Sequence, residues 1–203
     1  YTLYTYDNEG KRAIAAESMK YASNGLNEPL MYGKLSIYTG MPGEDRRQYD
    51  AAKMLETVSN NNSIVLLDCD FNTNYGYLKE AGEIYLVQSM DVLTIQPLTA
   101  YLRDLKAKNI LKEEKVKIVI NKYTKLKGVT EKTIIGGMAF YNDPSMSFMT
   151  ELFNRETVRY AVVPFEMQTY TKYLEGLINC SITTNGYSKE FMNSLRKLAS
   201  MVY

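Results

Sequence analysis

The 203-residue sequence contains no histidine and only two cysteines, Cys69 and Cys180. Without histidine, the chain cannot supply a Ser-His-Asp or Cys-His catalytic group, or a histidine-ligated metal centre. The two cysteines are far apart and lack the spacing of metal ligands, which argues against a structural zinc site and against a disulfide framework. Such sparse cysteine is typical of a reducing compartment, and we therefore expect a cytoplasmic protein.

The sequence also lacks an excess of charge of either sign. Its 24 lysines and arginines and 23 aspartates and glutamates leave a net charge of +1. This balance argues against a protein surface whose main role is to bind nucleic acid or anionic lipid, although it allows a local basic patch. No apolar run approaches the ~18 residues that span a bilayer. The length suits one α/β domain with a full core, and we expect residues 1–203 to form it.

A short apolar run, Ile64–Leu67, leads directly into Asp68, with Asp70 two residues later. Since this run has no polar alternation, it predicts a strand that is buried on both faces. An acidic residue at the end of such a strand lies at the carboxyl edge of a parallel sheet, where open α/β folds bind their ligands. The simpler interpretation of Asp70 is that it caps a helix or forms a turn.

Strand-like and helix-like segments alternate along the rest of the chain. This alternation predicts an α/β fold with a mainly parallel, twisted sheet and helices on both faces, in a doubly wound arrangement. Strands are predicted over residues 2–6, 34–39, 83–87, 116–120 and 160–163. Helices are predicted over residues 10–22, 45–59, 94–109, 130–140, 145–154, 167–179 and 188–202.

Candidate ligand-binding residues therefore lie where these strands end. Each has a simpler interpretation: Asn121 as a turn residue, Lys122 as a solvated lysine, and methionine or tyrosine at helical spacing as part of the core. The candidates are Asp7, residues 40–43, Asp68 with Asp70, residues 89–91, Asn121 with Lys122, and residues 164–166.

The order of these segments resembles the ParA/MinD-like, deviant Walker branch of the P-loop NTPases, and looks closest to the CpaE/TadZ-like proteins of pilus assembly. The similarity covers roughly two thirds of the chain, and it depends on four matches in the right order. IVLLD (64–68) resembles the Walker B strand, and residues 79–105 resemble the strand and helix that follow it. KIVINKY (117–123) is similar to the strand that ends in an adenine-contacting Asn, and AVVPFE (161–166) to the late strand that ends in Pro.

The resemblance implies ATP or ADP with Mg²⁺ as cofactors. Asp68 would be the catalytic Walker B carboxylate and would hold Mg²⁺ through water, since hard cations prefer oxygen ligands. Asn121 would contact adenine, because an amide side chain can both donate and accept. Lys122, Pro164 and Phe165 would complete the nucleotide-binding residues, with Pro164 fixing the backbone beside the base.

The sequence departs from the family in one respect: no G-x-x-x-x-G-K-[ST] motif, nor its lysine-bearing variant, occurs in it. Gly10-Lys11 and Gly33-Lys34 lack the surrounding pattern. One explanation is that the phosphate-binding loop lies upstream of Tyr1, in which case the protein is an ATPase and this chain is the C-terminal part of its domain. The other is a degenerate relative that no longer hydrolyses ATP. The non-methionine start favours the first explanation.

Two functional classes remain open. The first is a nucleotide-dependent switch that forms a homodimer and positions a pilus, secretion or DNA-partition apparatus, with recruitment to a cell pole or the inner membrane face. The second is a catalytically inactive domain for protein interaction and localisation. A flavodoxin-like or receiver domain is disfavoured, because the chain is much longer. Partner specificity is expected in residues 125–159, unless Met146, Phe148 and Met149 pack in the core.

Overall fold

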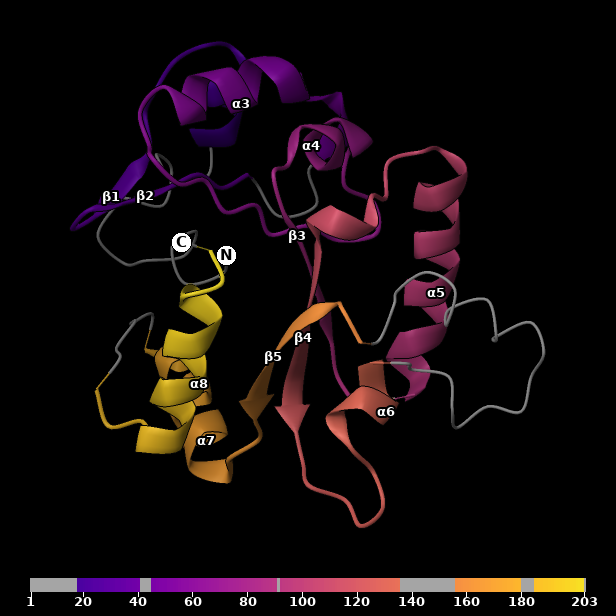
Figure 1. Ribbon diagram of the computed structural model, residues 1–203. Coiled ribbons are helices and arrows are strands. Elements are labelled where there is room, and N and C mark those ends of the chain that lie inside the picture. Colours follow the sequence, from indigo (N-terminus) through magenta and orange to yellow (C-terminus); the bar gives the residue numbers. More distant parts are fainter. Residues whose placement is uncertain (1–17, 41–44, 91, 136–155, 180–184, 203) are drawn as a thin grey trace. The chain divides into compact units, whose positions relative to one another are not determined.

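The computed structural model shows a mixed α/β protein that divides into two compact units (Figure 1). The first unit comprises residues 1–80 and 173–183, and the second comprises residues 81–172 and 184–203. The structure describes residues 18–40, 45–90, 92–135, 156–179 and 185–202.

Several predicted segments lie wholly or largely outside the described residues. These are the strand over residues 2–6 with Asp7, most of the helix over residues 10–22, and the whole of the helix over residues 145–154, which includes Met146, Phe148 and Met149. The proposed role of residues 125–159 in partner specificity therefore stays a prediction.

The first unit is built on helices and one small hairpin. Strands β1 (Leu30–Tyr32) and β2 (Leu35–Ile37) pair antiparallel around Gly33, whose φ of 61° suits glycine. The prediction of a strand over residues 34–39 therefore located β2, but that strand belongs to a hairpin and not to a parallel sheet. The other elements are a helix over residues 18–23, η1 (Arg46–Gln48), α3 (Ala51–Ser59) and α4 (Tyr75–Glu80).

Helix α3 supplies most of the first unit's core. Asp50 is its N-cap, and the Asp50 Oδ1 atom accepts a hydrogen bond of 3.1 Å from the backbone N–H of Lys53. The apolar side chains of α3 recur at helical spacing and therefore share one face. The resulting core contains Ala51, Met54 and Val58 of α3, with Ala22 and Tyr77.

The second unit contains a parallel three-stranded sheet in the order β3-β4-β5. Helix α8 packs against β5 and α6 against β4, and Figure 1 shows these two helices on opposite sides of the sheet. The sheet flanked by helices confirms the α/β class, while the larger doubly wound sheet stays a prediction. The strands are β3 (Ile84–Gln88), β4 (Val116–Tyr123) and β5 (Arg159–Pro164). The helices of this unit are α5 (Val92–Ala107), η2 (Glu113–Lys115), α6 (Glu131–Ile135) and α8 (Lys189–Ala199). Helix α7 (Met167–Ile178) begins in this unit, and its residues from Tyr173 onward belong to the first unit.

Strand β4 is the centre of this sheet, because it pairs with β3 on one edge and β5 on the other. Its first five residues, Val116–Ile120, are all buried, as expected for a strand covered on both faces. Leu102 and Leu105 of α5 are likewise inaccessible to solvent. Within the part of the chain that the structure describes, no helix has both the length and the apolar character needed to cross a membrane.

The apolar run Ile64–Leu67 differs from its prediction. Residues 64–67 belong to no strand among the described residues, and Leu66 is 78% exposed. Val65 and Leu67 pack against the core around α3, whereas Ile64 and Leu66 face solvent. The prediction of a strand buried on both faces is therefore wrong: this extended segment buries one side only. A run of four apolar residues does not by itself predict which of their side chains will pack against the core.

Candidate functional site at the carboxyl edge of the sheet

Four of the predicted site residues meet at the carboxyl edge of the β4–β5 pair. Asn121 and Lys122 lie near the end of β4, while Pro164 ends β5 and Phe165 follows it. The strands are parallel neighbours, so these ends lie side by side. The contact is direct, because Tyr123 pairs with Pro164 and the Phe165 N–H donates to the Tyr123 carbonyl at 2.9 Å. The sequence thus identified a group of residues that the fold brings together.

Asn121 and Lys122 form a β-bulge. Ile120 pairs with Val162 and Tyr123 pairs with Pro164, so two residues of β4 face the single residue Val163 of β5. Lys122 adopts a left-handed backbone conformation, with a φ of 55°. This conformation costs a non-glycine residue about 1–2 kcal/mol. Such strain is concentrated at functional sites, where the surrounding structure maintains it.

The side chain of Asn121 supports the bulge from within. Its Oδ1 atom accepts a hydrogen bond of 2.9 Å from the backbone N–H of Lys122. The Asn121 Nδ2 group has no hydrogen-bond partner among the described residues. Asn121 is half-buried. Its amide can therefore donate to a ligand without giving up the bond that stabilises the bulge.

Aromatic side chains line the same edge. Phe165 is 41% exposed, and the centroid of its ring lies 6.2 Å from that of Tyr170 in the first turn of α7, with an interplanar angle of 47°. The Lys122 Nζ atom lies 5.8 Å from the centroid of the Tyr170 ring, within range of a cation–π interaction. Exposed aromatic faces beside a cation and an amide are suited to bind a flat, polar heterocycle such as a nucleobase.

Sequence analysis did not identify Tyr170, because tyrosines at helical spacing were assigned to the core. The one available signal was proximity, since Tyr170 lies five residues after Phe165 at the start of a predicted helix. Of the other candidates, residues 41–43 and Asp91 fall outside the described residues.

Asp68 and Asp70 lie in the first unit and differ in their contacts. Asp70 forms a turn: its Oδ1 atom accepts from the Asn72 N–H at 2.9 Å and from the Thr73 hydroxyl at 3.2 Å. The simpler interpretation of Asp70 is therefore confirmed. Asp68 is exposed and has no hydrogen-bond or ion-pair partner among the described residues. A free carboxylate of this kind suits Mg²⁺, which is usually held by one or two carboxylates, water and substrate phosphates.

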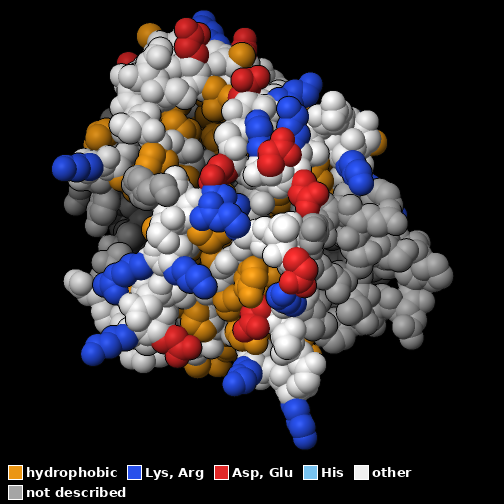
Figure 2. Space-filling view, viewed as in Figure 1, with side chains coloured by type: hydrophobic (Ala, Val, Ile, Leu, Met, Phe, Trp, Pro, Cys, Tyr) orange, Lys and Arg blue, Asp and Glu red, His pale blue; other side chains and the backbone are white. Residues whose placement is uncertain are grey.

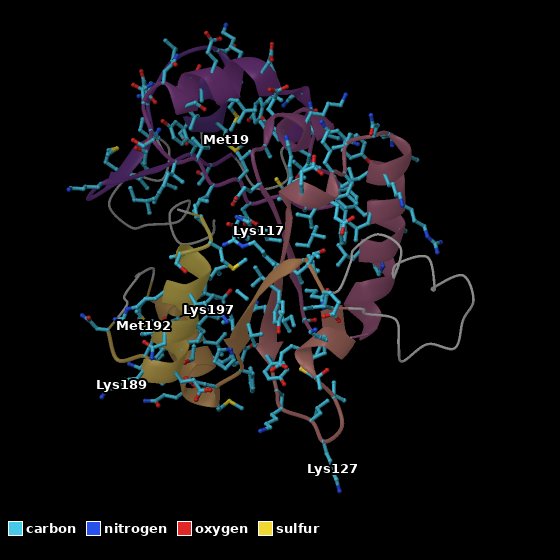
Figure 3. The ribbon with its side chains drawn as sticks, in the orientation of Figure 1. Met19, Lys117, Lys127, Lys189, Met192 and Lys197 are labelled. Carbon is cyan, nitrogen blue, oxygen red and sulfur yellow. The ribbon has the colours of Figure 1, made fainter. Side chains whose placement is uncertain are left out.

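A second polar group surrounds Lys117, near the amino end of β4. Lysine and arginine side chains are scattered over the face shown in Figure 2. Lys127, Lys189 and Lys197 are exposed, and Figure 3 shows Lys127 and Lys189 projecting outward. Lys117, by contrast, is only 4% exposed. Its Nζ atom donates to the Glu83 carboxylate, to the Tyr85 hydroxyl at 3.3 Å and to the Met201 carbonyl at 2.6 Å. We call these four residues the Lys117 cluster.

The Lys117 cluster satisfies all three donors of the ammonium group. The hydrogen bond from Lys117 lowers the pKa of Glu83, and a second one from Tyr85 adds to the effect. Burial, followed by the hydrogen bond to Glu83, raises the pKa of Tyr85 to about 12. Because Met201 follows α8, the cluster attaches the end of that helix to the central strand. Its role is structural, and a lysine inside an otherwise apolar strand was its only sign in the sequence.

Comparisons of this chain with protein-family models, with curated proteins and with solved structures find no match. The resemblance to ParA/MinD-like proteins therefore depends on the quoted sequence segments alone. The arrangement at the β4–β5 edge is an independent physical observation, because it comes from the backbone pairing and from ring and amide geometry.

Proposed function

We propose that this chain binds an adenine nucleotide at the carboxyl edge of β4 and β5. We further propose that it acts as a ParA/MinD-like ATPase domain, whose nucleotide-dependent homodimer positions a pilus, secretion or DNA-partition apparatus. The observation that carries the binding proposal is the strained bulge at Asn121 and Lys122. A lysine in the left-handed backbone conformation costs conformational free energy, here in the central strand of the sheet. The two residues that form this bulge are also the ones expected to contact the base.

The described side chains suggest a role for each residue. The base would stack on the exposed ring of Phe165, and the Asn121 Nδ2 group would donate to a ring nitrogen. The ammonium group of Lys122 would stay near the aromatic pair and favour an anionic ligand. Asp68, in the first unit, would hold Mg²⁺ through water, as the resemblance implies.

A second function, a catalytically inactive interaction and localisation domain, is favoured by the lack of a glycine-rich phosphate-binding motif in the sequence. Backbone amides of such a loop normally supply most contacts to the phosphates. This chain alone would therefore recognise the base more strongly than the phosphates. The two functions share the fold but differ in whether nucleotide changes the oligomeric state.

Titration calorimetry with adenosine, Mg-ADP and Mg-ATP tests the binding site. We expect all three to bind with affinities within about fivefold of one another, because base contacts dominate. Asn121→Ala and Phe165→Ala should each weaken binding by about tenfold, the size expected for a lost stacking or amide contact. Phe71→Ala is the matched control, since Phe71 is also an exposed phenylalanine but lies in the first unit.

Failure of all three ligands to bind the unaltered chain would contradict the site. Equal losses in Phe71→Ala and Phe165→Ala would contradict it as well. Sedimentation velocity with and without Mg-ATP separates the two functions: a nucleotide-dependent dimer supports the switch. Binding without any change in mass supports the interaction domain.

Lys122→Gly tests whether the backbone strain is maintained for binding. Glycine adopts a positive φ without steric cost, so we expect the free energy of unfolding to rise by up to about 1 kcal/mol. The same change removes the cation beside Tyr170, and adenosine affinity should fall severalfold. Asn109→Gly is the control, because Asn109 also has a positive φ, of 56°, just after α5. Asn109→Gly should leave the adenosine affinity unchanged. If Lys122→Gly also left it unchanged, the role given to Lys122 in binding would be contradicted.

A further inference from the structure

Glu166 connects the starts of two helices directly beside the aromatic pair. Its Oε2 atom accepts from the Thr169 hydroxyl at 2.8 Å, in the first turn of α7. Its Oε1 atom accepts from the Ser188 hydroxyl at 2.6 Å, at the start of α8. The Glu166 carbonyl also accepts from the Tyr170 N–H at 2.9 Å. One residue therefore contacts both helices and the backbone of Tyr170.

Ser188 has a second role at the same point. It is the N-cap of α8, and its Oγ atom accepts from the Phe191 N–H at 2.9 Å. The single hydroxyl proton of Ser188 goes to Glu166, while its oxygen accepts from Phe191. The one donor of the Ser188 hydroxyl is thus used, and the bond to Glu166 depends on its ability to donate.

Two further contacts restrain the chain on either side of Glu166. The Phe165 N–H is bonded to the Tyr123 carbonyl, so the residue before Glu166 is attached to β4. The Lys172 side chain lies over the turn at Gly186, whose φ is 78°. The Phe165 and Tyr170 rings lie on the two sides of Glu166 in the sequence. Glu166 connects the segment that carries both rings to Ser188, at the start of α8.

We propose that Glu166 is a positioning residue for the base-binding edge, and that its carboxylate, by joining Thr169 to Ser188, fixes the orientation of the Phe165–Tyr170 ring pair. The effect on ligand affinity rests on the proposed function. The effect on the rings does not, because it follows from hydrogen bonds within the protein. Hydrogen bonds to an ionised carboxylate are stronger than those between neutral groups, which suits a residue that has to hold a turn.

A pair of variants at Ser188 isolates the contact. Ser188→Asn and Ser188→Asp both retain a good N-cap acceptor for Phe191. Only the asparagine can also donate to Glu166, since an ionised aspartate has no proton to give and adds a like charge. The two side chains are nearly equal in size. Any difference between the variants therefore reports on the contact with Glu166, through the lost bond and the added like charge, and not on the capping of α8.

The sequence contains no tryptophan, so Phe165→Trp provides a single indole emitter at the site. In this background we expect Ser188→Asp to increase acrylamide quenching of the indole in the ligand-free protein. Adenosine affinity, measured by the same fluorescence, should fall about tenfold, the size expected for one lost bond to a charged group. Ser188→Asn should stay within about twofold of the parent in both measurements.

The double variant Ser188→Asp with Glu166→Gln provides a rescue. The introduced glutamine amide can donate to the aspartate and still accept from Thr169, so the connection is restored with donor and acceptor exchanged. We expect quenching and affinity to return to within about threefold of the parent. Equal behaviour of Ser188→Asn and Ser188→Asp, or no recovery in the double variant, would overturn the positioning role.

The two proposals can fail separately. If no variant binds adenosine, the proposed function is contradicted, while acrylamide quenching of the ligand-free protein still decides whether Glu166 orients the edge. If all variants bind adenosine equally and quench equally, the positioning role is contradicted and the binding site stands.

Discussion

Replacing Lys117 by methionine is expected to lower the free energy of unfolding by about 2–3 kcal/mol, measured by urea denaturation at pH 7. Methionine keeps most of the buried stem, so the loss reports on the ammonium group and not on a cavity. Without Lys117, the Met201 carbonyl loses a buried donor and the Glu83 carboxylate loses its cation. The full penalty of an unpaired buried charge does not apply, because the Glu83 side chain is 40% exposed and can be rehydrated.

Lys197→Met is the matched control, since Lys197 is exposed on α8 and Lys117 is not (Figure 3). It should change the free energy of unfolding by less than about 0.5 kcal/mol. Equal effects of the two substitutions would show that the Lys117 cluster does not stabilise the fold. A large loss in Lys117→Met would also identify the attachment of α8 to β4 as a major source of stability in the second unit.

The pH dependence gives this prediction a second measurement. The pKa of Glu83 is lowered in the folded protein, chiefly by the hydrogen bond from Lys117. The ionised Glu83 therefore adds to the free energy of unfolding above its ordinary pKa of 4.5, and this stabilisation is lost as the pH falls below that value. The stability difference between the parent and Lys117→Met should therefore narrow in acid. The pKa of Tyr85 is raised from 10.0 to about 12 in the folded protein. The neutral Tyr85 therefore makes its full contribution to the free energy of unfolding below pH 10, and that contribution is lost as the pH rises towards 12.

The parallel sheet was predictable because its strands carry a strong and simple signal. The apolar segments over residues 83–87, 116–120 and 160–163 correspond closely to β3, β4 and β5. Burial on both faces of a central strand requires an unbroken apolar run, and such a run is easily recognised. The long helices α5, α7 and α8 were predictable for a related reason, since their apolar residues recur at helical spacing.

The details that define the site were less predictable. The predicted strand ended at Ile120, because Asn121 is a typical turn residue and Lys122 was interpreted as a solvated lysine, yet β4 continues to Tyr123 through a bulge. A bulge depends on the register of two strands, which a single sequence does not specify. The hydrogen bond from Ser188 to Glu166 joins residues 22 positions apart, and it too becomes visible only in the folded chain.

The segment Ile64–Leu67 shows the opposite case, in which a clear apolar pattern predicted a buried strand that the structure does not form. The run has the same composition as a buried strand, but only Val65 and Leu67 pack against the core around α3. Burial is a property of the neighbours as much as of the residue itself. The assignment of Asp68 as a magnesium ligand consequently rests on the resemblance and on its free carboxylate, and stays a prediction.

Ile120→Ala is expected to lower the free energy of unfolding by about 3–4 kcal/mol, the largest effect of any substitution considered. Ile120 is fully buried at the centre of the sheet and pairs with Gln88 of β3 and Val162 of β5. Truncating it removes three carbons from a packed core and leaves a cavity that two flanking strands cannot readily close.

Val87→Ala supplies the control for Ile120→Ala, because Val87 lies in the same sheet but is 61% exposed. We expect it to cost less than about 0.5 kcal/mol, measured by urea denaturation under the same conditions. Ile120 directly precedes the bulge, yet the bonds that hold Asn121 and Phe165 in place lie beyond it, between Lys122 and Asn121 and between Phe165 and Tyr123. Adenosine affinity per folded molecule should therefore change less than about threefold in Ile120→Ala. A loss of affinity as large as that of Asn121→Ala would mean that core packing, and not the local hydrogen bonds, maintains the bulge.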